Sequence, residues 1–349
     1  MKPKENLVTV CGHNTTMLHH MLRHYQHNVK EIFVVLYAHH KDDPVIEEGK
    51  QILEKFNLKP YKIAIEEAFN WERVTELYNE TTSLKPDEWW IVSDDDELQL
   101  YSKPTYQIID ECEDNGWEFV TGGFLDRIGE DGKFPKITED CDVWKEMPNA
   151  GFFRYPLSRA EANKVTLLKG KHNVVPGQHF IQFDDGSTSW GKSHPLRYPV
   201  EKNFTQVHHF KWDYSVLQRL KEVSKSTANE SFAQEYAQML SAIEYLDYKL
   251  DLNKYFKDFL AQSWVENVDD DGNPVGKKRL NLDRFDEEIK RFRDVQATIG
   301  ALHSSTDIDF LRINSQPIQQ AMSTWVTKWV YMFTSYLQNH LTEKLFSIK

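Results

Sequence analysis

The sequence predicts an α/β protein with a mostly parallel sheet and flanking helices, followed by an α-helical C-terminal region. Short apolar strands alternate with amphipathic helices over the first hundred residues, and the pattern turns helical from Tyr214 onward. Strands that alternate with helices run parallel, because each helix carries the chain back across the sheet. Ligands of such sheets bind at the carboxyl ends of the strands.

Apolar runs of four to seven residues are typical of buried strands, and apolar residues three and four apart indicate helices. The expected strands span residues 7–11, 32–37, 61–65, 89–92 and 118–124. The expected helices span 17–25, 45–56, 71–82, 106–113, 214–224, 229–260, 283–300 and about 316–345. Residues 126–200 are mixed, and the acidic stretch 269–274 reads as a plain hairpin or loop rather than a calcium site.

Composition and charge narrow the function classes. The 349 residues are 40% hydrophobic and 28% charged, which is typical of a soluble globular protein. The net charge of −12 disfavours binding of nucleic acid through bulk electrostatics, which needs a basic face. The three cysteines are widely spaced without a CxxC pair, and no run of 18 apolar residues occurs. We therefore expect reduced thiols, a cytoplasmic location and no membrane span.

Four consecutive acids follow the apolar strand 89–92: Asp94, Asp95, Asp96 and Glu97. Adjacent carboxylates repel and lose hydration when buried, so the run is either a solvated turn or a cation site. Residues two apart on an extended segment point to the same side, which would let Asp94 and Asp96 hold one divalent ion. Carboxylates suit Mg²⁺ or Mn²⁺, ions that usually also bind substrate phosphates.

The segment WWIVSDDDE resembles the strand and DxD element of GT-A glycosyltransferases, and more specifically the glycosyltransferase 2-like and family 92-like group. The opening VTVCGHNTTMLHHMLRHYQHNVKEIFVVLY is similar to that of the group, although Thr15 stands where the group usually has Glu. The resemblance covers about residues 6–130. It implies a Rossmann-like GT-A catalytic domain over 1–213, with a nucleotide-sugar half over about 1–130 and an acceptor half over about 131–213. A helical region over 214–349 follows.

A second segment, TQVHHFKWDYSVLQRL at 205–220, resembles the strand of the group that carries a His followed by a basic residue. The resemblance implies that His209 completes the metal shell of Asp94 and Asp96. It implies that Lys211 contacts the diphosphate, while His208 faces the other side of the strand. The residues expected to contact the nucleotide sugar are Asn14, Asp42, Asp43, Arg73, Asp94, Asp95 and Lys211. Turn chemistry is the alternative for Asn14, Asp42 and Asp43, and pairing with Glu76 is the alternative for Arg73.

The acceptor side carries the candidates for catalysis. An inverting transferase needs a base that deprotonates the acceptor hydroxyl, whereas a retaining enzyme does not need one in the same place. Asp126 follows the strand 118–124, and His179 and Asp184 lie in the loop-rich stretch 167–186. The spacing of His172 and His179 matches no common zinc site. We expect the base, if there is one, to be Asp126, His179 or Asp184.

These features predict a metal-dependent hexosyl- or pentosyltransferase that moves a sugar from a nucleotide-diphosphate sugar to an acceptor hydroxyl. The acceptor stays open among a glycan, a lipid-linked molecule, a small molecule and a modified DNA base. A non-catalytic scaffold of this fold and a nucleotidyltransferase of related fold are the alternatives. A nucleotidyltransferase should have a phosphate-binding loop rich in Gly and basic residues after the first strand. The turn at 11–14 has no Lys or Arg, which argues against that alternative. The C-terminal helices could form an oligomer interface.

Overall fold

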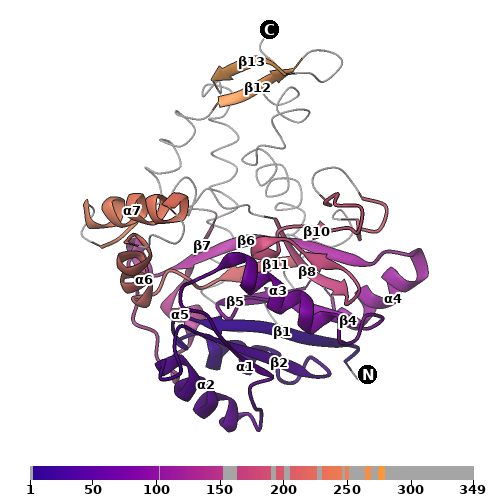
Figure 1. Ribbon diagram of the computed structural model, residues 1–349, viewed down its shortest axis with the longest axis horizontal. Coiled ribbons are helices and arrows are strands. Elements are labelled where there is room, and N and C mark those ends of the chain that lie inside the picture. Colours follow the sequence, from indigo (N-terminus) through magenta and orange to yellow (C-terminus); the bar gives the residue numbers. More distant parts are fainter. Residues whose placement is uncertain are drawn as a thin grey trace.

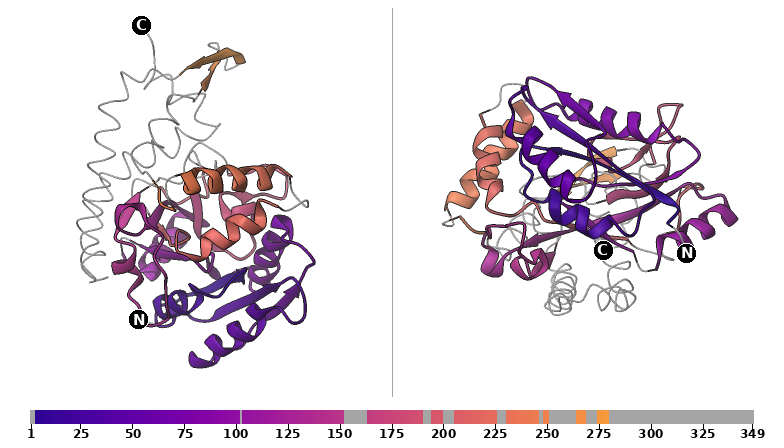
Figure 2. Two further views of the ribbon diagram at one scale, coloured as in Figure 1. Left: turned by 90° about the vertical axis from the view of Figure 1, so that its left-hand side faces the viewer. Right: turned by 90° about the horizontal axis from the view of Figure 1, so that it is seen from below.

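The computed structural model describes residues 3–101, 103–151, 163–189, 194–199, 205–225, 230–245, 248–250, 264–268 and 274–279. Nine strands form one sheet with helices on both faces, which confirms the predicted α/β class (Figures 1 and 2). The order is β3-β2-β1-β4-β8-β6-β11-β5, with β7 paired to β6. These strands are β1 Glu5–Gly12, β2 Ile32–Ala38, β3 Lys62–Ile65, β4 Trp89–Val92, β5 Glu97–Leu100, β6 Phe119–Ile128, β7 Asn149–Gly151, β8 Asn163–Lys169 and β11 Thr205–His209.

The first four strands form the parallel half of the sheet, as predicted. β1 pairs with β2 on one side and with β4 on the other, and β2 pairs with β3. Buried side chains alternate along β1, so that Leu7 and Cys11 face one core and Val8 and Val10 the other. The loops after β1, β2 and β4 therefore leave the sheet at the same edge.

The second half of the sheet is mixed. β8 runs antiparallel to both β4 and β6, whereas β11 runs parallel to β6 and antiparallel to β5. The strands β5 and β8 lie in stretches for which the sequence analysis predicts no strand. Gly122 allows β6 to approach β11 closely, because a Cβ there would lie 2.2 Å from the Thr205 carbonyl oxygen. This pairing brings the end of β11 beside the acidic loop.

Helices cover the two faces of the sheet unequally (Figure 1). The helices α1 Leu18–Tyr25, α2 Pro44–Lys55 and α4 Thr105–Asn115 contribute to the core that contains Leu7 and Cys11. The helix α3 Trp71–Thr82 contributes to the core on the opposite face. These four confirm the predicted helices of the first half of the chain.

Short elements between residues 130 and 182 join the longer strands. They are the 3-10 turns η1 Glu130–Gly132 and η2 Pro176–Gln178, the helix α5 Val143–Glu146, and the paired strands β9 Asn173–Val174 and β10 Ile181–Gln182. The turn η2 and the strand β9 contact α3, which fixes the segment that carries His179 against the parallel half of the sheet.

The helices α6 Ser215–Val223 and α7 Glu230–Tyr245 pack against each other at one end of the sheet (Figure 1). The prediction of a continuous helix over 229–260 is wrong at 248–249, because Tyr248 has a positive φ of 56° and Lys249 pairs with Lys133 in an antiparallel bridge. Residues 251–260 of that prediction lie outside the described residues. The strands β12 Trp264–Val268 and β13 Pro274–Arg279 pair antiparallel, in agreement with the hairpin alternative. The predicted helices over 283–300 and 316–345 lie outside the described residues, and the predicted domain division and oligomer interface stay predictions.

All three cysteines are described, and each is free rather than part of a disulfide. Among the described helices, none combines the length and the apolar character that crossing a membrane requires.

Candidate functional site

A cavity of about 140 Å³ lies at the carboxyl ends of β1 and β4, where the parallel topology predicts a ligand. It collects six of the predicted site residues: Asp94, Asp95, Asp96, His179, His209 and Lys211. Further lining residues are Val10, Gly12, His13, Tyr37, Phe69, Trp71, Val74, Lys164, Gly177, Arg219, Glu235 and Tyr236. A smaller adjoining cavity is lined by Asn14 together with Asp95, Asp96, Lys211 and Arg219.

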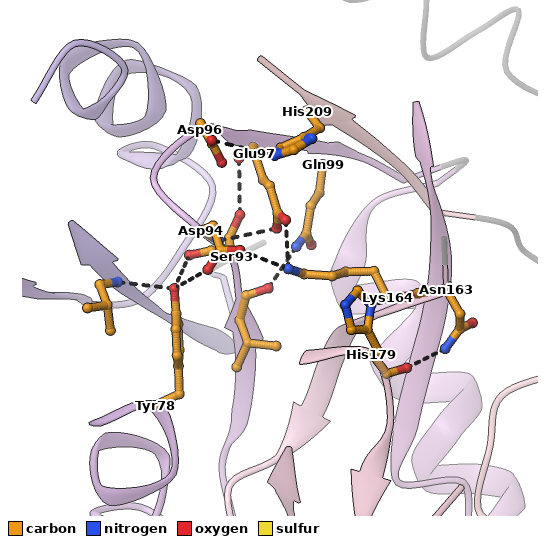
Figure 3. Close-up of polar contacts among 12 residues, drawn as sticks. Tyr78, Ser93, Asp94, Asp96, Glu97, Gln99, Asn163, Lys164, His179 and His209 are labelled. Atoms are coloured by element: carbon orange, nitrogen blue, oxygen red, sulfur yellow. Dashed lines mark hydrogen bonds and ion pairs between the residues drawn. The ribbon is translucent and has the colours of Figure 1, made fainter. Parts of the chain in front are cut away.

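The first three residues of the acidic run line the cavity. The run is held in place by contacts from two sides (Figure 3). The Tyr78 hydroxyl donates to Asp94 Oδ1 at 2.8 Å, and Lys164 Nζ donates to Asp94 Oδ2 at 3.0 Å. Lys164 Nζ also lies 2.6 Å from Glu97 Oε1. The loop is therefore neither a plain solvated turn nor an unbalanced acidic cluster, because a buried ammonium from β8 lies between two of its carboxylates.

Burial and the neighbouring charges together shift the pKa values of these carboxyl groups. Burial raises the pKa of Glu97 to about 7, and the Lys164 ammonium opposes that shift. Burial also acts to raise the pKa of Asp94, but Lys164 and the hydrogen bonds from Lys164 and Tyr78 outweigh it and leave that pKa below its usual range. For Asp95, burial and the neighbouring Asp96 raise the pKa well above its usual value. The loop thus carries less negative charge than its sequence suggests.

His209 connects Asp96 to the buried Asp126. Its Nδ1 lies 2.9 Å from Asp126 Oδ1, and its Nε2 lies 3.5 Å from Asp96 Oδ2. Burial lowers the pKa of His209, but Asp96 and Asp126 outweigh it and raise that pKa to about 9. Trp212 Nε1 donates to Asp126 at 3.3 Å, which helps to fix the carboxylate. Asp126, 0% exposed, orients His209 rather than reaching the cavity.

The donor set at Asp96 and His209 fits a divalent cation. Within the part of the chain that the structure describes, no group of three His, Cys, Asp or Glu side chains is arranged to hold a metal. Mg²⁺ needs only one or two carboxylates when substrate phosphates and water complete its shell. A metal-ligating His almost always donates its other ring N–H to a carboxylate, a backbone carbonyl or water, and Asp126 is such a partner for His209. Asp94 is a less available ligand, because both of its oxygens already accept hydrogen bonds.

Aromatic rings form one wall of the cavity. His13, which has a positive φ of 64°, stacks on Phe69 with ring centroids 5.6 Å apart and an interplanar angle of 30°. Tyr37 packs edge-on against Phe69, and its hydroxyl donates to the Ala68 carbonyl oxygen. Burial and the nearby Arg219 lower the pKa of His13 to about 3, so this ring is neutral at pH 7. Flat, uncharged rings of this kind can stack on the face of a nucleobase.

Two cationic side chains, Lys211 and Arg219, form a further wall of the cavity. Lys211 lies just after β11, and its Nζ donates to the Tyr236 hydroxyl at 3.2 Å. Arg219 comes from α6 and Tyr236 from α7, so the helix pair contributes directly to the cavity. Burial acts to raise the pKa of Tyr236, but Arg219 and Lys211 outweigh it and lower that pKa.

Besides the buried Asp126, four predicted residues line neither cavity. Asp42 and Asp184 are exposed, and Asp43 caps α2 by accepting from the Val45 backbone N–H at 3.1 Å. Arg73 forms ion pairs with three carboxylates, Glu66, Glu76 and Glu80. For Asp43 and Arg73 the structure shows the alternative roles that the sequence analysis left open, and a nucleotide contact from any of the four stays a prediction.

Asn14 and His208 also have defined partners. Asn14 Nδ2 donates to Ser215 Oγ at 3.3 Å, which links the turn after β1 to the start of α6. His208 is buried, lies 3.1 Å from Gln206 Oε1 and packs edge-on against Trp144. It points away from the acidic loop, as the alternation along the strand predicts.

Sequence reasoning missed Lys164, Arg219, Tyr236 and the aromatic wall. Lys164 could have been predicted as a buried charge, because NKVTLLK at 163–169 has the β-branched and aliphatic composition of a buried strand. A lysine inside such a strand needs a buried partner. Arg219 and Tyr236 lie on helices whose sequences carry no signal for a cavity, so only their packing reveals them.

No known family profile matches the chain. A stretch of 136 residues is 30% identical to the flagellar outer-arm dynein beta chain of Chlamydomonas reinhardtii, and it covers 38% of this chain but 3% of that protein. The chain therefore spans a small fraction of the length of this relative.

Three solved structures show a distant likeness. S. aureus TarS matches at 11% identity over 91% of this chain and 55% of that one, with a TM-score of 0.28. TarS 1–349 in complex with UDP matches at 12% over 92% and 91%, with a TM-score of 0.26. A putative glucose-1-phosphate thymidylyltransferase from Bacillus anthracis matches at 10% over 38% and 58%, with a TM-score of 0.24. These scores are low and carry no argument, so the assignment of a Rossmann-like α/β core rests on the strand order and pairing of the chain itself.

Proposed function

We propose that the chain is a GT-A glycosyltransferase of the glycosyltransferase 2-like and family 92-like group. It transfers a sugar from a nucleotide-diphosphate sugar to an acceptor hydroxyl, with Mn²⁺ or Mg²⁺ as its cofactor. One observation carries the proposal: a single cavity at the strand ends combines an acidic surface, an aromatic wall and a cationic wall. These three surfaces match the metal, the base and the diphosphate of such a donor.

Each surface has a defined task in this proposal. Asp96 and His209 hold the ion, and Asp126 fixes the orientation of His209. The ion, when bound, neutralises charge on the leaving diphosphate. Lys211 contacts the same diphosphate, and the nucleobase of the donor lies against the ring of Phe69. Asp94, which Tyr78 and Lys164 hold in place, accepts a hydrogen bond from a sugar hydroxyl of the nucleotide sugar in this proposal.

Of the three residues predicted as the general base that deprotonates the acceptor, His179 lines the cavity. Its Nδ1 lies 2.8 Å from the Asn163 carbonyl oxygen, so Nδ1 carries the proton and Nε2 carries the lone pair. This tautomer can accept a proton from an acceptor hydroxyl. Asp126 is buried behind His209, and Asp184 is exposed outside the cavity. The geometry therefore favours His179 over the other two candidates.

The first test is thermal unfolding with a panel of nucleoside diphosphates and sugar nucleotides, with and without Mn²⁺. A ligand that binds only the folded state raises the midpoint. We expect one nucleotide to raise it in the presence of Mn²⁺, and Asp96→Asn to abolish the shift. Asp114→Asn, an exposed carboxylate on α4, is the charge-matched control and should keep it.

Product analysis then separates the alternatives. Release of nucleoside diphosphate and free sugar from the stabilising donor supports a glycosyltransferase. Release or consumption of pyrophosphate would indicate a nucleotidyltransferase. No shift with any nucleotide in either buffer would refute the proposed donor site.

A further inference from the structure

We propose that Arg219 is the principal anion-binding side chain of the cavity and that, with Lys211, it holds the diphosphate of the donor. The identity of that anion rests on the proposed function, whereas the anion site itself does not. The consequence is that the helix pair α6–α7 completes the donor site.

The first step is the lack of a counter-ion at Arg219. None of the described carboxylates lies within ion-pairing distance of its guanidinium, and the buried Nε–H has no acceptor among the described residues. Arg73, by contrast, has three carboxylate partners. The Arg219 side chain is partly buried, which acts to lower its pKa, but Tyr236 and the acidic residues 94–96 raise that pKa through space without touching it. A bound anion would give the guanidinium a direct hydrogen-bonding partner.

The second step is position. Arg219 and Lys211 line both the main cavity and the smaller adjoining one, and Asp95 and Asp96 line the same two spaces. Arg219 thus faces the acidic loop across open volume instead of touching it. A diphosphate fits this arrangement, because its oxygens can face the guanidinium on one side and an ion at Asp96 on the other. The planar guanidinium can also donate two parallel hydrogen bonds to one phosphate group.

The third step is how the fold fixes Arg219. The turn before α6 is anchored by Asp213, which accepts from the backbone N–H and the hydroxyl of Ser215. Ser215 in turn accepts from Asn14 in the turn after β1. The helix that carries Arg219 is therefore tied to the parallel half of the sheet. A domain boundary between residues 213 and 214 would divide the donor site.

The test is isothermal titration calorimetry with inorganic pyrophosphate as the probe, with and without Mg²⁺. Arg219→Met removes the charge but keeps an unbranched apolar side chain. We expect it to weaken pyrophosphate binding at least about tenfold, the scale of lost hydrogen bonds to a charged group. Lys221→Met removes one charge from the exposed face of the same helix and should bind like the wild type. Arg219→Lys should recover part of the affinity, which separates loss of charge from misfolding.

Each outcome decides a different question. Binding that depends on Arg219, in a protein that binds no nucleotide, supports the anion site and refutes the proposed function. Nucleotide and pyrophosphate binding that survive Arg219→Met, in a folded variant, refute the anion site and leave the proposed function standing. Absence of pyrophosphate binding by the wild type also refutes the anion site.

Discussion

Lys164→Met should destabilise the protein strongly, because it removes the cation that balances the acidic loop. The Lys164 side chain is 1% exposed and lies 2.6 Å from Glu97, which is 0% exposed, and 3.0 Å from Asp94. Methionine preserves most of the packing volume of the lysine stem. The substitution therefore isolates the charge rather than creating a cavity.

The expected loss follows from the burial of the partners. Removing one member of a buried ion pair costs up to about 3 to 5 kcal/mol, because the remaining group must lie buried without its counter-ion or take up a proton. Glu97 can take up that proton, since burial already raises its pKa to about 7 beside Lys164. Glu97 is the group left fully buried, whereas Asp94 is 31% exposed and keeps its hydrogen bond from Tyr78. The second substitution Glu97→Gln should therefore restore at least about 1 kcal/mol, within the range that coupled neighbours show.

The assay is urea-induced unfolding at pH 7, followed by tryptophan fluorescence and by circular dichroism. Lys171→Met is the matched control, because Lys171 pairs with Glu118 while 46% exposed. Exposed pairs contribute at most about 1 kcal/mol. A loss no larger for Lys164→Met than for Lys171→Met, or no recovery in the double variant, would refute the view that Lys164 balances the loop.

Three further predictions concern other parts of the fold. Asp126→Asn should weaken Mn²⁺ binding about 10- to 100-fold, because the carboxylate that orients His209 is lost; titration calorimetry measures this, and unchanged affinity would contradict a metal at His209. Gly122→Ala should cost about 3 kcal/mol or more, because the added Cβ would overlap the Thr205 carbonyl oxygen; urea unfolding measures it, and a loss below about 1 kcal/mol would contradict the close approach. Asp43→Ala should cost about 1 kcal/mol through the lost helix cap; the same assay applies, with Asp43→Asn as the control that should keep most of the cap.

The sequence alone determined the parallel half of the sheet and the edge at which the candidate cavity lies. Strands at 7–11, 32–37 and 89–92 are short apolar runs with helical segments between them, and this local pattern leaves few topologies possible. Because the carboxyl ends of parallel strands share one edge, the position of Asp94 and Asp96 in the chain already placed them at the ligand edge. The alternation along β11 likewise separated His209 from His208.

Only the tertiary structure decided which groups balance the charges at that edge. Lys164, Arg219 and Tyr236 reach the cavity from β8, α6 and α7, elements far from the acidic loop in sequence. Electrostatic interactions depend on separation in space and on burial, and neither can be read from local residue patterns. For the same reason Asp43, which matches a ligand-binding position by sequence, is seen only in three dimensions to cap a helix.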